Sequence, residues 1–214
     1  MREQGSAQDN NEQLQTPCTV SLDAQVQCMR NETVYRVYRT AGILKDPERE
    51  TRRLSEDYAI ELWQPGAGSI VPPTMSSRFI VWWLFYVFGI LGNRIYRVLL
   101  IRHNGAVVHR SCLVPKYFRW PFMGEDDVQI SSTWTDPKHR GRGLATFALS
   151  FLVQSYAEGA RQFWYICRED NQASIGVCLR CGFQFHCLMR RTHPWGSLLF
   201  GRFVPVWVGG ENLV

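Results

Sequence analysis

The chain has 214 residues, with 24 lysines and arginines against 19 aspartates and glutamates, which gives a net charge of +5. Its hydrophobic fraction of 45% and charged fraction of 20% are ordinary globular values, and they exclude collagen-like, coiled-coil and fully disordered proteins. Residues 1–32 carry two basic and five acidic side chains, a net −3, so the remaining chain is +8. A basic folded part suits nucleic acid, an anionic membrane or a phosphorylated ligand.

The first residues and the cysteines bear on domain organisation and setting. Residues 1–30 are rich in Gln, Asn, Glu and Ser, so we expect a disordered tail followed by one domain over 31–214. The seven cysteines are odd in number and the first residues lack an apolar leader core, which favours a reduced, cytoplasmic setting. Cys178 and Cys181 form a single CxxC pair without a second pair at zinc-site spacing, so we expect no metal.

Apolar periodicity predicts the elements in chain order. Strands are expected at 33–40, 96–103, 106–114, 127–135, 163–167, 183–190 and 198–208. Helices are expected at 46–63, 144–155 and 171–181. Asp46-Pro47 predicts the start of the first helix, because Asp caps exposed N–H groups and Pro is tolerated in the first turn. Asn104-Gly105 predicts a tight hairpin between the second and third strands.

The stretch Phe79–Gly92 is the most apolar part of the chain. As a helix, its 14 residues span roughly 21 Å, which is shorter than the ~30 Å hydrocarbon core of a bilayer. Because apolar residues cover every face, we expect a helix buried in the core or in a homodimer interface. The alternative is peripheral membrane contact through its aromatic residues and the nearby arginines.

A strand, a Gly-rich turn and an amphipathic helix follow one another from Thr133 to Phe151. The turn reads Lys138-His139-Arg140-Gly141-Arg142-Gly143-Leu144-Ala145. Glycines let backbone N–H groups converge and the helix N-terminus adds a positive dipole end, so the turn suits a phosphate. It lacks the Walker A and dinucleotide-binding patterns, and taken alone it is also compatible with an ordinary helix start.

Two segments together resemble a known family. Arg140-Gly-Arg-Gly143-Leu-Ala145 resembles the Arg/Gln-x-x-Gly-x-Gly/Ala signature of the GNAT superfamily of acyl-CoA-dependent N-acetyltransferases. Thirty-one residues after Arg140, Asn171-Gln-Ala-Ser174 opens a segment that ends in Gly182-Phe183 and is similar to the second GNAT signature. Because both occur in this order, separated by one helix and one strand, the chain is identified as a member of that superfamily.

The resemblance implies an α/β (α+β) fold with a mixed, mostly antiparallel sheet, flanked by helices and splayed between its fourth and fifth strands. Acetyl-CoA, the implied co-substrate, would lie in the split. Its pyrophosphate would sit on the backbone amides of the turn, and its pantetheine would pair with the preceding strand. The residues implied to bind it are Thr133, Trp134, Thr135, Arg140, Gly141, Arg142, Gly143, Leu144, Ala145, Asn171 and Ser174.

Acyl transfer to an amine requires proton transfers, because a primary amine with a pKa of about 10 is mostly protonated at pH 7. Asp127 lies thirteen residues before Arg140, about where family members carry a carboxylate base. Its alternative role is in a solvated acidic loop. Cys178 stands where the family often has a tyrosine acid, and it is either a thiol donor or a small buried helix residue. The other candidate bases are a water, Asp136, His139 and His109.

The expected function is transfer of an acetyl group to a primary amine by direct attack in a ternary complex. The stretch Val108–Trp134 is similar to GNAT enzymes of bacterial surface-polysaccharide synthesis, which implies an amino-sugar acceptor; a protein amine or another small-molecule amine stays open. The rival interpretation is a non-catalytic module of the same fold that binds coenzyme A or a partner. We expect no nucleic-acid partner, because the cations are dispersed and no RNA-reading motif occurs.

Overall fold

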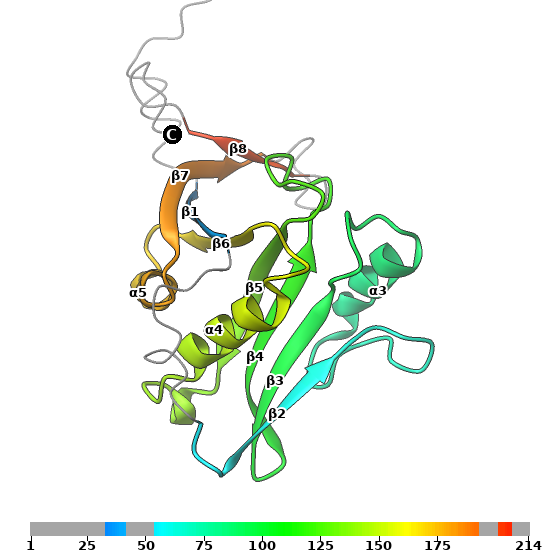
Figure 1. Cartoon of the computed structure of the whole chain (residues 1–214), viewed down its shortest axis with the longest axis vertical. Helices are drawn as coiled ribbons and strands as arrows, with labels where there is room; N and C mark the ends of the chain where they lie inside the picture. The colour runs from blue at the N-terminus through cyan, green and yellow to red at the C-terminus, as the bar shows by residue number, and fades with distance from the viewer. Residues whose placement is uncertain (1–32, 42–53, 193–200, 207–214) are drawn as a thin grey trace, which may run out of the picture. The chain divides into compact units, whose positions relative to one another are not determined.

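The computed structural model of the chain describes three ranges, residues 33–41, 54–192 and 201–206 (Figure 1). The tail expected at 1–30 lies outside these ranges, as do the expected helix start at 46–53 and parts of the strand expected at 198–208. The bounds of the tail and of the domain at 31–214 therefore stay predictions.

The described residues form one sheet of eight strands with helices on both faces. The strands are β1 Val34–Thr40, β2 Tyr58–Trp63, β3 Arg97–His103, β4 Ala106–Pro115, β5 Val128–Thr135, β6 Phe163–Arg168, β7 Gln184–Arg191 and β8 Phe203–Pro205. The helices are α3 Ile80–Val87, α4 Leu144–Tyr156 and α5 Gln172–Arg180, with short 3-10 helices η1 Ser77–Phe79 and η2 Pro137–His139.

The strand order in the sheet is β2-β3-β4-β5-β6-β1-β7-β8. Every neighbouring pair is antiparallel except β5 and β6, which run parallel. The predicted mixed, mostly antiparallel sheet is therefore confirmed. The parallel pair also joins the fourth and fifth strands in the sheet order, where the split was expected.

Strand β1 lies inside the sheet, between β6 and β7, although it comes first among the described strands. Val37 and Tyr38 are both buried, on opposite faces of the sheet. This explains the apolar and aromatic alternation of its sequence, because a central strand needs side chains that pack on both sides.

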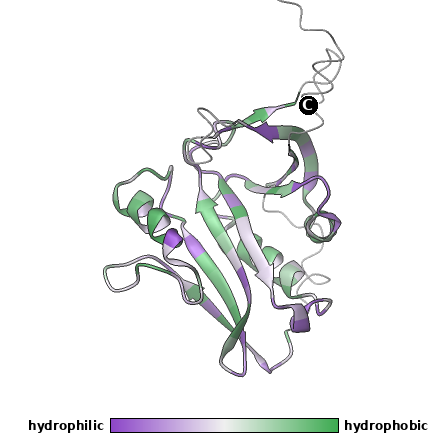
Figure 2. Ribbon diagram, turned by 180° about the vertical axis from the view of Figure 1, so that it is seen from behind, coloured by the Kyte–Doolittle hydropathy of each residue, from purple (hydrophilic) through white to green (hydrophobic). Residues whose placement is uncertain are grey.

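Two apolar clusters lie on opposite faces of the sheet. Leu99 and Ile101 of β3 belong to the cluster that α4 and α5 cover, whereas Val98 and Leu100 belong to the cluster that α3 covers. In the view from behind in Figure 2, the middle of β3 is green. Since β3 is buried on both faces, its apolar residues run continuously instead of alternating.

The helix expected at 46–63 is wrong over 58–63, where the chain forms β2. Each residue from Tyr58 to Trp63 pairs with β3, and Trp63 packs edge-on against Tyr96. Pairing with a long buried strand is a non-local effect that local apolar periodicity does not report. The Asn104-Gly105 hairpin is confirmed, since both residues have positive φ, as its turn type requires.

Helix α3 is shorter and more exposed than the predicted buried helix at Phe79–Gly92. It covers Ile80–Val87, none of its residues is buried, and Gly89 follows with φ +67. Its inner face packs on the sheet through Trp82 and Phe85. The expectation of a helix buried in the core was wrong, because only one side of this helix meets the sheet; the homodimer interface stays a prediction. Among the described residues, no helix is long and apolar enough to cross a membrane.

Candidate functional site

The sheet opens where β5 and β6 diverge. The two strands pair over only three residues, from Val128 opposite Phe163 to Ile130 opposite Tyr165. Beyond this point β5 continues to Thr135 while it pairs only with β4. The backbone of β5 therefore loses its partner on one side, which leaves hydrogen-bonding groups available to a ligand.

A bulge in β5 lies at the start of this opening. Cys112 of β4 faces Ser131, whereas Arg110 faces Trp134, so β5 carries one extra residue. Ser132 has φ +51, which is uncommon for a residue with a side chain. Bulges leave backbone groups unpaired and turn the strand, so this bulge can direct backbone donors into the opening.

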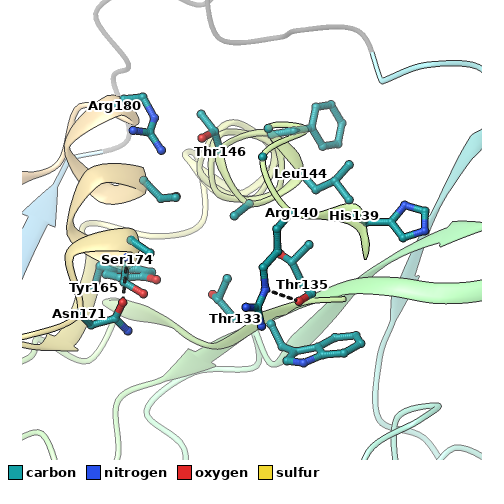
Figure 3. Close-up of a pocket in the computed structure, with 17 residues that line it drawn as sticks. Thr133, Thr135, His139, Arg140, Leu144, Thr146, Tyr165, Asn171, Ser174 and Arg180 are labelled. Atoms are coloured by element: carbon teal, nitrogen blue, oxygen red, sulfur yellow. Dashed lines mark hydrogen bonds between the residues drawn. The ribbon is translucent and has the colours of Figure 1, made fainter. Parts of the chain in front are cut away.

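A cavity of about 1130 Å³ fills the opening (Figure 3). One wall is the end of β5 with the Gly-rich turn and the first turn of α4, and the other wall is Tyr165 with α5. Asn171 caps α5, because its Oδ1 accepts a hydrogen bond from the Ser174 N–H at 3.1 Å. The residues that line the cavity are Thr133, Trp134, Thr135, His139, Arg140, Gly141, Gly143, Leu144, Ala145, Thr146, Phe147, Tyr165, Asn171, Ala173, Ser174, Val177 and Arg180.

The Gly-rich turn leaves the N-terminus of α4 without a capping side chain. Asp136 opens the turn and accepts a hydrogen bond from the Lys138 N–H at 2.8 Å. Gly141 and Gly143 have φ +75 and +81, and Gly143 is the N-cap residue of α4. Gly143 has no side chain that could accept from the first-turn amides, so these donors and the helix dipole suit an anion.

The cavity is electropositive. Arg140 and Arg180 line it, and Arg140 donates from Nε to the carbonyl oxygen of Thr135 at 3.2 Å. Among the described residues that line it, none is acidic. We call this cavity between β5 and β6 the wedge. Its uncapped helix amides and two arginines, with no carboxylate among its described lining residues, suit a phosphate-bearing ligand with an extended arm.

The comparison with known families decides the family. Residues 56–183, more than half of the 214, match the model of the Acetyltransferase (GNAT) family. The chain belongs to the GNAT family. The matched range includes both walls of the cavity, so the GNAT resemblance of the turn and of the segment from Asn171 is confirmed.

The chain matches individual relatives over only part of their length. The chain is 42% identical over 52 residues to the ribosomal-protein-serine acetyltransferase of Escherichia coli (strain K12), a match that spans 23% of this chain and 29% of that protein. A conserved protein of unknown function from Staphylococcus epidermidis ATCC 12228 has a similar fold, with 12% identity and a TM-score of 0.51 over 79% of this chain and 65% of that one. A GCN5-related N-acetyltransferase-like protein from Streptococcus suis 89/1591 aligns with a TM-score of 0.49 at 14% identity, over 78% of this chain and 64% of that one.

The structure gathers most of the predicted cofactor residues of this GNAT chain. Ten of the eleven line the cavity, and Arg142 is the exception. The guanidinium of Arg142 donates to the Tyr58 hydroxyl at 3.2 Å, and that hydroxyl also bonds to His139 Nδ1 at 3.1 Å. Arg142 therefore ties the turn to β2 with its side chain, while its backbone stays in the turn.

The predicted base Asp127 is not brought to the cavity. It precedes β5 at the closed end of the split and is 5% exposed. Its Oδ2 accepts hydrogen bonds from the Gly124 N–H and from Trp164 Nε1, both at 2.8 Å. These contacts favour a structural role, and the role of base stays a prediction.

The predicted acid Cys178 is on the buried side of α5, with 0% exposure, and is not among the residues that line the cavity. Burial raises the pKa of its thiol above the ordinary range, which makes it a weaker proton donor. Cys181, its CxxC partner, donates to the carbonyl oxygen of Thr146 at 3.5 Å. Among the described residues, no cluster of His, Cys, Asp and Glu suits a metal ion.

Sequence reasoning missed several residues of the cavity. Tyr165 of β6 lines it, and its hydroxyl bonds with Thr133 and Ser174; burial raises the pKa of Tyr165, and these hydrogen bonds oppose that rise. Strand β6 is buried on both faces, so alternation gave no signal. Val177 and Arg180 could have been found, because they follow Ser174 at helical spacing on the same face of α5.

A buried histidine supports the cavity from behind. His109 on β4 is 0% exposed, and its Nδ1 bonds to Thr135 Oγ1 at 2.8 Å. Its Nε2 bonds to Ser111 Oγ at 3.0 Å, and that hydroxyl donates to Thr133 Oγ1 at 3.2 Å. His109 thus fixes two threonines that line the cavity, without lining it itself.

His109 should make the folding stability depend on pH. Burial, with a smaller contribution from Arg110, lowers the pKa of His109 to about 4 from its ordinary 6.5. Below about pH 6.5 His109 binds a proton in the unfolded chain but stays neutral in the folded protein. The free energy of unfolding that His109 contributes above that pH is therefore lost as the pH falls towards 4. We expect a loss of about 2 kcal/mol between pH 7.5 and 5, with a limiting slope of about 1.4 kcal/mol per pH unit.

Urea unfolding at pH 7.5, 6.0 and 5.0 measures this effect, with His109→Gln as the comparison. The Gln side chain keeps a donor and an acceptor but does not titrate, so the variant should lose less stability on acidification than the parent. The pKa of His186 is also lowered by burial, but its contribution is the same in both proteins. Equal acid sensitivity of the two proteins would show that His109 does not cause the loss.

Proposed function

We propose that this GNAT chain is an acetyl-CoA-dependent N-acetyltransferase that acts on a primary amine by direct attack in a ternary complex. The observation that carries the proposal is the wedge between β5 and β6, which has an uncapped helix N-terminus on one wall. Its volume of about 1130 Å³ suits a ligand of the size of a nucleotide with an extended arm.

Each part of the wedge suits one part of the co-substrate. The amides of the turn from Arg140 to Ala145 would hold the pyrophosphate, with Arg140 adding charge. The unpaired edge of β5 at Thr133–Thr135 would bond to the amides of the pantetheine arm. Asn171 and Ser174 would contact the arm from the far wall.

The chemistry requires charge stabilisation and proton removal. The amine nitrogen forms a bond to the thioester carbonyl carbon, the C–S bond breaks, the amine loses a proton and the thiolate of coenzyme A leaves. Backbone N–H groups at the bulge, from Ser132 to Trp134, would stabilise the oxyanion. A thiolate is a tolerable leaving group, so the buried Cys178 need not donate a proton to it. Among the described residues that line the cavity, the phenol that could take the place of a tyrosine acid is Tyr165.

The base is the open part of the mechanism. Because no acidic residue lines the cavity among the described residues, we propose that a water relays the amine proton. His109 is held neutral and its pKa of about 4 makes it a weak base. Asp127 remains the carboxylate alternative, acting from the closed end of the split.

The acceptor is narrowed only to an amine. The connection from Lys116 to Gly124 is rich in aromatic residues with two cations, a composition that suits a sugar face or an anionic group and is the basis for the amino-sugar acceptor. However, Tyr117 and Trp120 are buried in the core, and no residue of the connection is among the described residues that line the cavity. The Escherichia coli relative is a ribosomal-protein-serine acetyltransferase, which supports a protein amine instead. Both belong in an acceptor panel.

A second candidate function is a non-catalytic module that binds coenzyme A or a partner. The positions of Asp127 and Cys178 outside the cavity favour it, because the predicted base and acid do not converge on one point. Binding and turnover therefore need separate measurements.

Acetyl-CoA at a hundredfold excess over its Kd should stabilise the protein by about 2.7 kcal/mol, which raises Tm by roughly 5–10 °C. Release of free thiol with an amine panel of amino sugars and serine peptides then separates the candidates. Saturable stabilisation with turnover supports the enzyme, and stabilisation without turnover on any amine supports the binding module. No stabilisation by acetyl-CoA or coenzyme A contradicts both the enzyme and a coenzyme A-binding module, and leaves only a module that binds a partner.

A further inference from the structure

The outward side of α3 and the turn after it form an apolar surface without a covering element among the described residues. We call this surface the α3 patch and define it by Ile80, Val87, Phe88 and Ile90. Phe88 is 73% exposed and the other three are 44 to 49% exposed. In Figure 2 α3 is mostly green. An exposed apolar helix face of this kind marks an interaction site more often than a surface that stays in contact with solvent.

The inner face of α3 accounts for only part of its sequence. Trp82 packs edge-on against Tyr117 at 5.1 Å between ring centroids, and Phe85 lies 5.8 Å from the same ring. These contacts hold the helix on the sheet. They give no reason for apolar residues on the opposite side, where Ile80 and Val87 face outward one above the other.

The stretch of sequence that contains α3 is rich in cations and poor in acids. Between Glu61 and Glu125 the chain has no Asp or Glu, although about five or six would be expected at the average frequency. The stretch holds seven cationic residues, Arg78, Arg94, Arg97, Arg102, Arg110, Lys116 and Arg119. Two of these cations are paired with the acids that bound the stretch, Arg102 with Glu61 at 2.7 Å and Lys116 with Glu125 at 2.6 Å. The cations that matter for the patch are therefore those next to α3.

Two exposed arginines flank the helix itself. Arg78 lies in η1, directly before α3, and is exposed. Arg94 follows the helix, with its guanidinium 5.0 Å from the centre of the Tyr86 ring and bonded to the Tyr86 carbonyl oxygen. Positive charge therefore stands at both ends of the apolar patch.

We propose that the α3 patch docks on an anionic membrane surface, with Phe88 and its neighbours at the boundary of headgroups and acyl chains and the arginines among the headgroups. An eight-residue helix is about 12 Å long, so it lies in the interface. Apolar burial and attraction to anionic lipid then act together. This inference does not depend on the proposed acetyl transfer.

A second copy of the chain fits the α3 patch less well. A symmetric dimer through this surface would bring Arg78 and Arg94 of each copy towards those of the other. The acid near Ile90, Glu125, is already paired with Lys116 of its own copy. Four partly exposed side chains also fall short of the roughly 800 Å² per partner of a stable interface. An anionic bilayer meets neither objection.

Sedimentation of the full chain with vesicles tests the proposal. We expect binding to vesicles of phosphatidylcholine with 30% phosphatidylglycerol, and little binding to phosphatidylcholine alone. Phe88→Asp should reduce the partition coefficient at least tenfold, and Arg78→Gln roughly fivefold. Because Phe88 is mostly exposed, its variant should keep the Tm of the parent.

The matched control is Leu179→Asp, which places the same charge at a residue of α5 that is 53% exposed. It should leave vesicle binding unchanged. No binding to anionic vesicles, equal binding to neutral ones, or equal loss in the Leu179 variant would overturn the proposal. A dimer in solution that dissociates in the Phe88→Asp variant, together with no binding of the parent to vesicles, would also overturn it.

Discussion

Gly143→Val is expected to weaken acetyl-CoA binding roughly 100-fold, or about 2.7 kcal/mol. Gly143 is the N-cap residue of α4 with φ +81, and apart from its chain neighbours no atom of the described residues would lie within 4 Å of a Cβ at this position. The added side chain would therefore occupy the space in which the pyrophosphate is proposed to sit. It would also strain the turn, since a left-handed conformation costs about 1–2 kcal/mol in a residue other than glycine. Isothermal titration with acetyl-CoA measures the loss.

Gly105→Val is the matched control for that experiment. Gly105 has φ +78 and equally open space around it, but it lies in the hairpin between β3 and β4 and does not line the cavity. Both variants should lose similar stability from backbone strain, and only the Gly143 variant should lose acetyl-CoA affinity. If both bind acetyl-CoA like the parent, the ligand does not use the turn.

Asp127→Ala is expected to destabilise the fold by about 4 kcal/mol. It leaves the Gly124 N–H and the buried Trp164 Nε1–H without the acceptor that they share, and each hydrogen bond to a charged group is worth about 1.5–3 kcal/mol. Asp127→Asn keeps an oxygen at that place, so we expect a loss of about 1 kcal/mol. Urea unfolding measures both. The neighbouring Asp126 is exposed, and Asp126→Ala should stay within about 0.5 kcal/mol of the parent.

The turnover of Asp127→Asn separates a structural role from that of a base. A structural Asp127 predicts a rate within a few-fold of the parent at a temperature at which both are folded. A drop of about 100-fold or more in kcat, with Tm preserved, would assign Asp127 as the base after all. This outcome would also show that the amine approaches from the closed end of the split.

The strands and helices of the matched family range were largely readable from the sequence, because their signals are local. Asn104-Gly105 fixes a hairpin through its own backbone preference, and α4 shows its buried face in its 3.6-residue period. Strand β2 was not readable, because its pairing with β3 is a contact between segments about 40 residues apart. The exposure of α3 was hidden for a related reason, since composition does not say how many sides of a helix are covered.

Some residues of the cavity walls were likewise predictable from the sequence, and others were not. The turn was found from its glycines, and the start of α5 from its resemblance to the second GNAT signature, because both are patterns of residue identity along the chain. Tyr165 was missed because it enters the cavity only where β5 and β6 part. Asp127 was assigned by its spacing from Arg140, and spacing does not report the two hydrogen bonds that hold it away from the cavity.

The sequence by itself determined the family, the Gly-rich turn and a basic chain fit for an anionic partner, because these depend on residue identity and local backbone preference. Only the tertiary structure decided which residues share the cavity, that His109 fixes Thr133 and Thr135 from behind, and that α3 presents apolar residues outward. These depend on which distant segments meet. Seven cations without an acid are visible in the sequence, but their meaning depends on the exposed Phe88 between Arg78 and Arg94.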